Sequence, residues 1–225
     1  MTDAVLATGI SKTFKTANAE VLVLQEVSFR VERGSSVALL GGARSGKTTL
    51  INLLAGLAQP SSGSLEVFGQ NLERLTEVEK ATYRREIVGL VSPEVPWLPQ
   101  FSLQDNVALP LLLANVPRRE VEGRVAEIRV SLELQEVSLN LLTPLEKQRW
   151  ALARGLIHRP KLLLVDGLET LDNEAEIFTE YMLEKISDLE VTAMFATRQP
   201  LVAAHARQIF TLKGSRLQVS REGRV

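Results

Sequence analysis

Residues 41–48 read GGARSGKT; they follow the apolar run 37–40 and open the helix-like stretch 47–57. The pattern G-x-x-x-x-G-K-[ST], placed between a strand and a helix, is typical of a phosphate-binding loop. Its backbone N–H groups point at phosphate oxygens, and the N-terminus of the helix adds a positive dipole. Lys47 is expected to reach the β- and γ-phosphates, and the Thr48 hydroxyl to bind Mg²⁺. The sequence therefore predicts a nucleotide site at Gly41, Gly42, Ala43, Arg44, Ser45, Gly46, Lys47, Thr48 and Thr49.

A second candidate ligand of Mg²⁺ lies at the end of a later apolar run. Residues 162–165 are four consecutive apolar residues, and Asp166 follows them. A carboxylate at the carboxyl end of a buried strand can hold Mg²⁺ through water, opposite a phosphate-binding loop. An aspartate that ends a strand often only starts a turn. Together with the loop at residues 41–48, however, Asp166 becomes a candidate metal residue.

The segments around these motifs predict an α/β fold. Apolar residues alternate along early stretches between residues 5 and 31, which indicates antiparallel strands. From about residue 103 to residue 142 they recur at helical spacing instead. Farther along, strand-like runs alternate with helix-like runs, which favours a mostly parallel sheet. We expect one domain over residues 1–225, with an N-terminal antiparallel β portion, a mostly parallel core sheet and a helical lobe inserted at about residues 83–145.

The composition excludes several kinds of function. Its 26 basic and 27 acidic residues leave a net charge of −1 without a long basic run, so no nucleic-acid partner is expected. The absence of cysteine excludes disulfides and thiolate metal sites and fits the cytoplasm. The longest strongly apolar stretch, residues 107–116, is about half the ~20 residues that a membrane helix needs. Any association with a membrane is therefore expected to depend on a partner.

These motifs, in this order, resemble those of the ABC-type ATPase subunits over almost the whole chain. Residues 96–117, PWLPQFSLQDNVALPLLLANVP, are similar to the LLPELTVLENVALPLLLAGVP pattern of the branch that serves lipoprotein-releasing and macrolide-exporter transporters. The resemblance implies that the Phe14 ring stacks on adenine. It also implies that two such subunits sandwich ATP with Mg²⁺ between them. Each subunit would dock on a transmembrane permease subunit through the groove between core and lobe, at the inner face of the cell membrane.

Four elements of the family pattern are altered in this chain. The glutamine of the family's Q-loop falls on Pro93, which has no side-chain amide. The glutamate that usually follows the Mg²⁺ aspartate falls on Gly167, so the expected general base is absent. The switch histidine falls on Arg198, which does not exchange a proton at neutral pH. The signature LSGGQ, which caps the partner subunit's γ-phosphate, falls on residues 142–146, LTPLE, where Pro144 and Leu145 replace both glycines.

Another alignment is open, because the segment 166–172 is one residue shorter than the family's DEPTxxLD. Sliding the gap puts Asp166 in the position of the general base and leaves Val165, which cannot bind a metal, in the position of the metal ligand. Pro160 precedes Asp166 at the family's usual distance, which favours the first alignment. Glu94 and Glu169 are candidate substitute bases, although acidic loop residues are more often solvated.

The leading hypothesis is a subunit that binds Mg-ATP but hydrolyses it weakly or not at all. It would act on a membrane partner through nucleotide-dependent dimerisation, with a second nucleotide-binding subunit that is either a more complete paralogue or another copy of this chain. Two alternatives stay open at this point. The chain could be a slow but genuine ATPase that uses an unusual base, or a soluble ATP-sensing regulator without a transporter.

Overall fold

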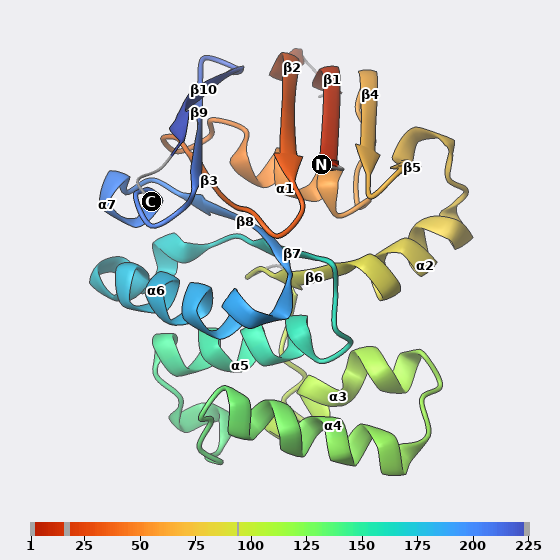
Figure 1. Ribbon diagram of the computed structural model, residues 1–225, viewed down its shortest axis with the longest axis vertical. Helices are drawn as coiled ribbons and strands as arrows, with labels where there is room; N and C mark the ends of the chain where they lie inside the picture. The colour runs from red at the N-terminus through yellow and green to blue at the C-terminus, as the bar shows by residue number, and fades with distance from the viewer. Residues whose placement is uncertain (1–2, 16–18, 94, 223–225) are drawn as a thin grey trace.

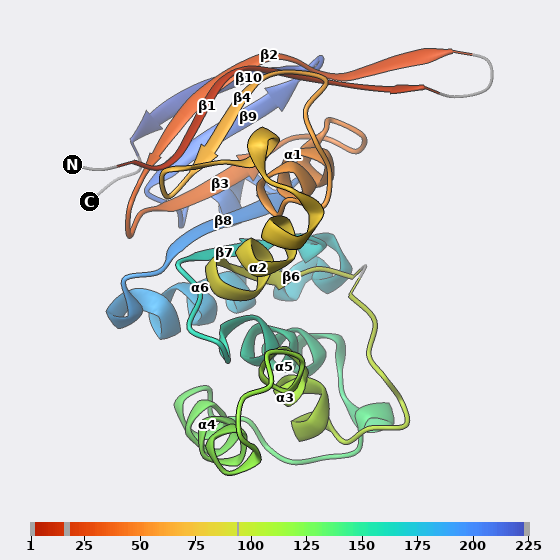
Figure 2. The ribbon, with the colours of Figure 1, turned by 90° about the vertical axis from the view of Figure 1, so that its right-hand side faces the viewer.

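The computed structural model describes residues 3–15, 19–93 and 95–222, and side chains as far as residue 219. The N-terminal part of the chain forms a four-stranded antiparallel sheet, as its alternating pattern predicts (Figure 1). Its strands lie in the order β2-β1-β4-β5, with bounds β1 Asp3–Lys15, β2 Glu20–Glu32, β4 Ser62–Val67 and β5 Gln70–Asn71. The ends of β1 and β2 project beyond the rest of the molecule as a hairpin (Figure 2).

The second sheet is the mostly parallel core sheet that the sequence predicts. It has six strands in the order β10-β9-β3-β8-β7-β6, and β6, β7, β8, β3 and β9 run parallel to one another. Only β10 pairs in the antiparallel direction within this sheet. The strand bounds are β3 Ser36–Leu40, β6 Val88–Val91, β7 Leu162–Val165, β8 Thr192–Thr197, β9 Gln208–Lys213 and β10 Arg216–Glu222.

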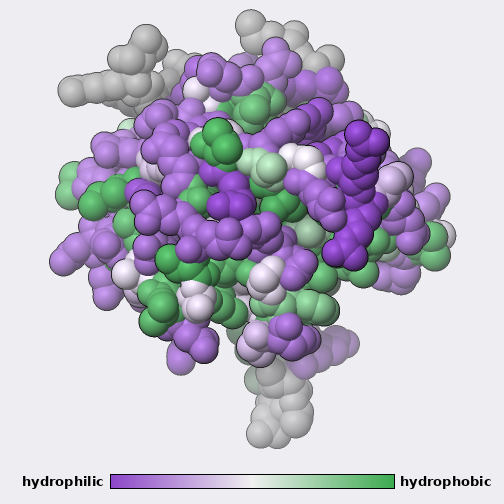
Figure 3. All heavy atoms as spheres, turned by 90° about the horizontal axis from the view of Figure 1, so that it is seen from below, coloured by the Kyte–Doolittle hydropathy of each residue, from purple (hydrophilic) through white to green (hydrophobic). Residues whose placement is uncertain are grey.

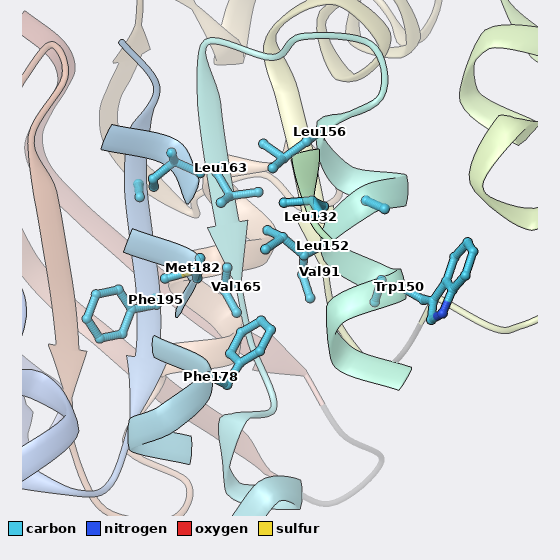
Figure 4. Close-up of a cluster of buried hydrophobic side chains, with 14 of the residues drawn as sticks. Val91, Leu132, Trp150, Leu152, Leu156, Leu163, Val165, Phe178, Met182 and Phe195 are labelled. Carbon is cyan, nitrogen blue, oxygen red and sulfur yellow. The ribbon is translucent and has the colours of Figure 1, made fainter. Parts of the chain in front are cut away.

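The core sheet separates two apolar layers, because successive strand side chains point to opposite faces. In β7, Leu163 and Val165 pack into one layer, and Leu162 and Leu164 pack into the other. The first layer contains α5 (Pro144–Leu156), α6 (Ala175–Ile186) and α7 (Pro200–Ala203), and its buried side chains meet between α5, α6 and the strands (Figure 4). The second layer contains residues of α1 (Lys47–Leu54), α2 (Glu77–Ile87) and both sheets.

A helical lobe lies beyond α5, at the opposite end of the molecule from the antiparallel sheet (Figures 1 and 2). It consists of α3 (Leu103–Leu113) and α4 (Arg118–Ser131), which pack on α5. The face of the lobe in Figure 3 is largely hydrophilic, with hydrophobic side chains in separate patches. Short 3₁₀ turns complete the described chain: η1 Leu72–Arg74, η2 Leu139–Leu141, η3 Leu168–Glu174 and η4 Ser187–Leu189.

The expected start of the lobe at residue 83 is wrong. The Tyr83 side chain is buried among core residues, and its hydroxyl donates to the Leu54 carbonyl oxygen at 2.6 Å. The strand β6 that follows pairs with β7 in the core sheet. The helical spacing in the sequence begins only at about residue 103, so the expected boundary at residue 83 wrongly included the end of α2 and the core strand β6. Within the described residues, no helix has the length and apolar character needed to cross a membrane.

Candidate nucleotide-binding site

The phosphate-binding loop connects β3 to α1, as the sequence predicts. Gly46 precedes the helix with a positive φ of 100°. A Cβ atom there would lie 2.9 Å from Leu24 Cδ2, so both the backbone conformation and the space require glycine. Within the loop, the Lys47 ammonium group donates to the carbonyl oxygens of Gly41 at 2.8 Å and Gly42 at 2.9 Å. The carbonyl oxygens of the loop therefore hold the ammonium group of Lys47, the first residue of α1.

A cavity of about 440 Å³ opens beside this loop. It contains most of the predicted phosphate-loop and metal residues, together with residues from three other loops. The residues that line it are Val23, Ala43, Arg44, Ser45, Gly46, Lys47, Thr48, Thr49, Ser92, Pro93, Asp166, Gly167, Glu169 and Arg198. Gly41 and Gly42 do not line the cavity; they accept the hydrogen bonds from Lys47.

Lys47 is the most buried cation of the cavity, and its side chain is only 7% exposed. Burial lowers the pKa of its ammonium group, and the positive charge of Arg198 acts in the same direction. The carboxylates of Glu169 and Asp166 oppose this lowering of the pKa of Lys47. A buried ammonium group that lacks full charge compensation is a favourable partner for phosphate oxygens.

Asp166 lies at the carboxyl end of β7, where it faces the loop across the cavity. It is buried, and its Oδ1 atom accepts a hydrogen bond from the Gly167 backbone N–H at 2.8 Å. Thr48 lines the same cavity, so the hydroxyl and carboxylate oxygens that Mg²⁺ prefers are both available. The buried Ser45 Oγ atom has no hydrogen-bond partner among the described residues. The donor set therefore fits a phosphate group with its Mg²⁺ ion.

Pro93 and Gly167 lie against one another in this cavity. Gly167 has a positive φ of 78°. A Cβ atom at this position would lie 2.2 Å from the Pro93 Cγ atom and 2.5 Å from its Cδ atom. Any side chain at residue 167 thus meets both an unfavourable backbone conformation and the proline ring.

Glu169 enters the cavity from η3. Its Oε1 atom lies 3.3 Å from Arg198 Nε and 3.8 Å from Lys47 Nζ, so one carboxylate bridges both cations. The sequence suggested Glu169 only as a substitute base and did not predict this bridge. Its two cations lie 122 and 29 residues away along the chain, and no local pattern connects them. Glu94, the other candidate base, lies outside the described residues.

Comparison with known proteins agrees with this geometry. A family model described as "ABC transporter" matches residues 24–168. The chain belongs to the ABC transporter family. It is an ATP-binding domain of this family, whose members bind ATP with Mg²⁺.

Two curated relatives test the expected branch. The lipoprotein-releasing system ATP-binding protein LolD of Chromohalobacter salexigens is 33% identical over 216 residues, covering 93% of this chain and 90% of that protein. The macrolide export ATP-binding/permease protein MacB 1 of Yersinia pestis is 32% identical over 213 residues, covering 93% of this chain and 33% of that protein. The resemblance to the lipoprotein-releasing and macrolide-exporter branch is therefore confirmed.

A solved structure confirms the ABC cassette fold. It is the dimeric post-hydrolysis state of the ATP-binding cassette MJ0796 bound to ADP and Pi, with a TM-score of 0.86 and 25% identity. The match covers 98% of this chain and 99% of that one. The ABC fold therefore extends over nearly the whole chain, including the helical lobe.

The segment expected to correspond to the family's signature begins α5. Thr143 precedes the helix, and Pro144 is its first residue. The Glu146 backbone N–H donates to Thr143 Oγ1 at 3.2 Å, and the Thr143 N–H donates to Glu146 Oε2 at 2.7 Å. Hydrogen bonds from the Thr143 backbone and side chain to the Glu146 carboxyl group lower its pKa, so a carboxylate stands at the helix N-terminus. The N-terminus of α5 is thus already capped by its own side chains.

Phe14 does not line the cavity. It is exposed near the end of β1, on the projecting hairpin, and the Lys12 ammonium group lies 5.0 Å from the centre of its ring. Val23, on the neighbouring strand β2, reaches the cavity instead. The stacking of adenine on Phe14 stays a prediction.

Proposed function

We propose that this ABC domain binds Mg-ATP in the cavity beside the phosphate loop and hydrolyses it weakly or not at all. The single observation that carries this proposal is the contact between Pro93 and Gly167 in a cavity whose phosphate loop is complete. Lys47, Thr48 and Asp166 supply the cation and the oxygen ligands. When bound, Mg²⁺ would neutralise phosphate charge. The chain's own residues bind and orient the nucleotide.

Weak hydrolysis follows from what the cavity lacks. At the position after Asp166, Gly167 offers no carboxylate to accept a proton from water. Pro93 offers no amide to hold that water, and an arginine side chain has only donors, so Arg198 cannot accept the proton. General-base catalysis alone contributes about 10²–10⁴ in rate. Purified protein, free of contaminating ATPase, is expected to turn over below about 1 s⁻¹, near the low end of common enzyme rates.

Lys47→Ala is expected to weaken Mg-ATP binding at least about tenfold, because it removes a charge-assisted contact to phosphate. The measurement is an equilibrium titration of the purified protein with Mg-ATP. Lys161→Ala is the matched control, because Lys161 is exposed and does not line the cavity. The proposal fails if neither the parent protein nor the control binds at millimolar ATP.

One observation supports a slow but genuine ATPase as the second candidate. The Glu169 carboxylate lies inside the cavity, near the cation that is expected to contact the γ-phosphate. If Glu169 served as the base, the parent protein would turn over measurably and Glu169→Gln would abolish this activity. The bridge to two cations argues against this candidate, because the carboxylate is already engaged by Lys47 and Arg198. The turnover measurement separates the two functions.

The proposed partner is a transmembrane permease subunit, which would hold the chain peripherally at the cytoplasmic face of the membrane. A groove of about 570 Å³, separate from the nucleotide cavity, lies between the core and the lobe and offers the docking site. Its lining combines apolar side chains such as Leu109 and Leu113 with the basic side chains Arg84 and Arg85. An amphipathic helix with an acidic residue fits this combination. A soluble ATP sensor would have no need for such a groove.

One wall of this groove is held by Arg154 of α5. Its guanidinium group donates to the carbonyl oxygens of Val95 and Pro96, both at 2.9 Å, and lies 4.6 Å from the centre of the Trp97 ring. Burial lowers the pKa of His158, which lines the same groove. Pro93 lines the nucleotide cavity, whereas Val95 and Pro96 line the groove. Their closeness along the chain gives nucleotide binding a physical route to a docked partner.

Leu113→Asp is expected to reduce recovery of the chain with its membrane partner at least about fivefold, because it removes an apolar contact and adds a negative charge that would repel the acidic residue of the docked helix. Leu113 is 77% exposed and lines the groove. Val130→Asp is the matched control: Val130 is 80% exposed on the same lobe but lies outside the groove. Membranes from cells that produce each tagged variant are washed, and the bound chain is quantified. Equal recovery of both variants would favour the soluble sensor.

A further inference from the structure

We propose that Glu169 competes with the γ-phosphate for Lys47 and Arg198, so that the cavity discriminates against the nucleoside triphosphate in favour of the diphosphate. This inference rests on the proposed binding of nucleotide in the cavity beside the phosphate loop. It assigns to Glu169 the role of a specificity-determining residue.

The two cations that Glu169 contacts are those best placed to meet a γ-phosphate. Lys47 belongs to the phosphate loop, where its expected contacts are the β- and γ-phosphates. Arg198 follows β8 and lines the same cavity. The Glu169 carboxylate lies 3.8 Å from the first cation and 3.3 Å from the second. An anion of this chain therefore already occupies the place between them.

The loop that carries Glu169 is held in position from both ends. At its start, the Thr170 hydroxyl donates to the Gly167 carbonyl oxygen at 2.8 Å. At its end, the Gln199 amide donates to the Asp172 carbonyl oxygen at 3.0 Å. The Glu169 side chain is only 23% exposed. The carboxylate is thus presented to the cavity rather than left in solvent.

Binding of a γ-phosphate in the cavity is opposed in one of two ways. If the Glu169 carboxylate stays, it repels the phosphate, because like charges at short distance are strongly unfavourable in a partly buried site. If it moves away, its ion pairs with Lys47 and Arg198 are lost. A diphosphate has no γ-phosphate, and its main expected contact with these cations is between its β-phosphate and Lys47. The carboxylate therefore weakens triphosphate binding more than diphosphate binding.

The test compares Mg-ATP and Mg-ADP affinities of the parent protein and of Glu169→Gln by titration calorimetry. Glutamine keeps the size of the side chain and removes the charge. The affinity for Mg-ATP is expected to rise about tenfold, equivalent to about 1.4 kcal/mol, and that for Mg-ADP less than about threefold. Glu127→Gln is the matched control: it makes the same charge change at a 70% exposed side chain on α4 that does not line the cavity.

The outcomes separate this inference from the proposed function. Equal gains for both nucleotides, or no gain for either, would overturn the role of Glu169 while leaving nucleotide binding intact. No binding of either nucleotide by the parent protein would instead overturn the proposed function. If Glu169→Gln fails to fold by circular dichroism, Glu169→Ala replaces it, with the same expected change in the ratio of the two affinities.

Discussion

Gly167→Glu, which puts a carboxylate at the position where the family has its general base, is expected to destabilise the protein without restoring hydrolysis. The new Cβ atom would lie 2.2 Å from the Pro93 Cγ atom, on a residue with a φ of 78°. Overpacking and a left-handed backbone conformation each cost about 1–3 kcal/mol, so urea unfolding is expected to show a loss of about 2–6 kcal/mol. A working base would raise turnover about 10²–10⁴-fold, whereas a gain below about tenfold is expected here.

A double-mutant cycle with Pro93→Gln tests the cause. Removing the proline ring relieves the close contact, so the double variant is expected to be at least about 1 kcal/mol more stable than the sum of the single effects. Gly123→Glu serves as the control, because a Cβ atom at this helical glycine has no neighbour within 4 Å. Gly167→Glu alone reaching 10²-fold higher turnover with unchanged stability would contradict the argument.

The parts of the site that could be predicted from sequence are those made by consecutive residues. The run from Gly41 to Thr49 follows strand β3 directly and contains the turn and the start of α1, so its motif has a recognisable local structural context. Asp166 was found for a similar reason, since it ends a short apolar strand. Neighbouring residues in the sequence determine the conformation of the phosphate loop and the position of Asp166 at a strand end. In the structure the loop and Asp166 line the same cavity.

Contacts between distant residues could not be predicted in this way. Pro93 and Gly167 each departed from the family pattern, but nothing in the sequence shows that the ring of one fills the space beside the other. The charge of Glu169 was visible, whereas its two cationic partners come from α1 and from the end of β8. Such contacts depend on how the sheet orders its strands, which periodicity does not specify.

The second prediction concerns the N-terminus of α5, the segment expected to face the partner subunit's nucleotide. In the family this helix start caps the γ-phosphate of the partner subunit, through backbone N–H groups that must be free. Here Thr143 and Glu146 cap the helix reciprocally, and Pro144 has no N–H group. The Glu146 carboxylate also brings negative charge to the position that a phosphate would approach. A homodimer of this chain would have two such obstructed interfaces.

A mixed dimer with a more complete paralogue would be asymmetric. Lys47 and Asp166 of this chain would face a normal signature segment, and we propose that ATP is held there as a static clamp. The paralogue's phosphate loop would face the LTPLE segment of this chain, with the paralogue supplying the base. Residual hydrolysis is expected at this second interface. Lys47→Ala should accordingly loosen the dimer more than it slows hydrolysis.

Restoring the signature is therefore expected to raise the turnover of the native complex. The variant Thr143→Ser/Pro144→Gly/Leu145→Gly should increase the rate, and adding Glu146→Gln should bring the gain to about 10²-fold, the effect of providing free donors to developing charge. Leu141→Gly is the control, because Leu141 is 75% exposed and precedes the segment. Turnover is measured on complexes purified through a tag on this chain. A complex that contains only this chain as its nucleotide-binding subunit, and still cycles ATP, would overturn the asymmetric scheme, because neither interface would then have a base from a paralogue.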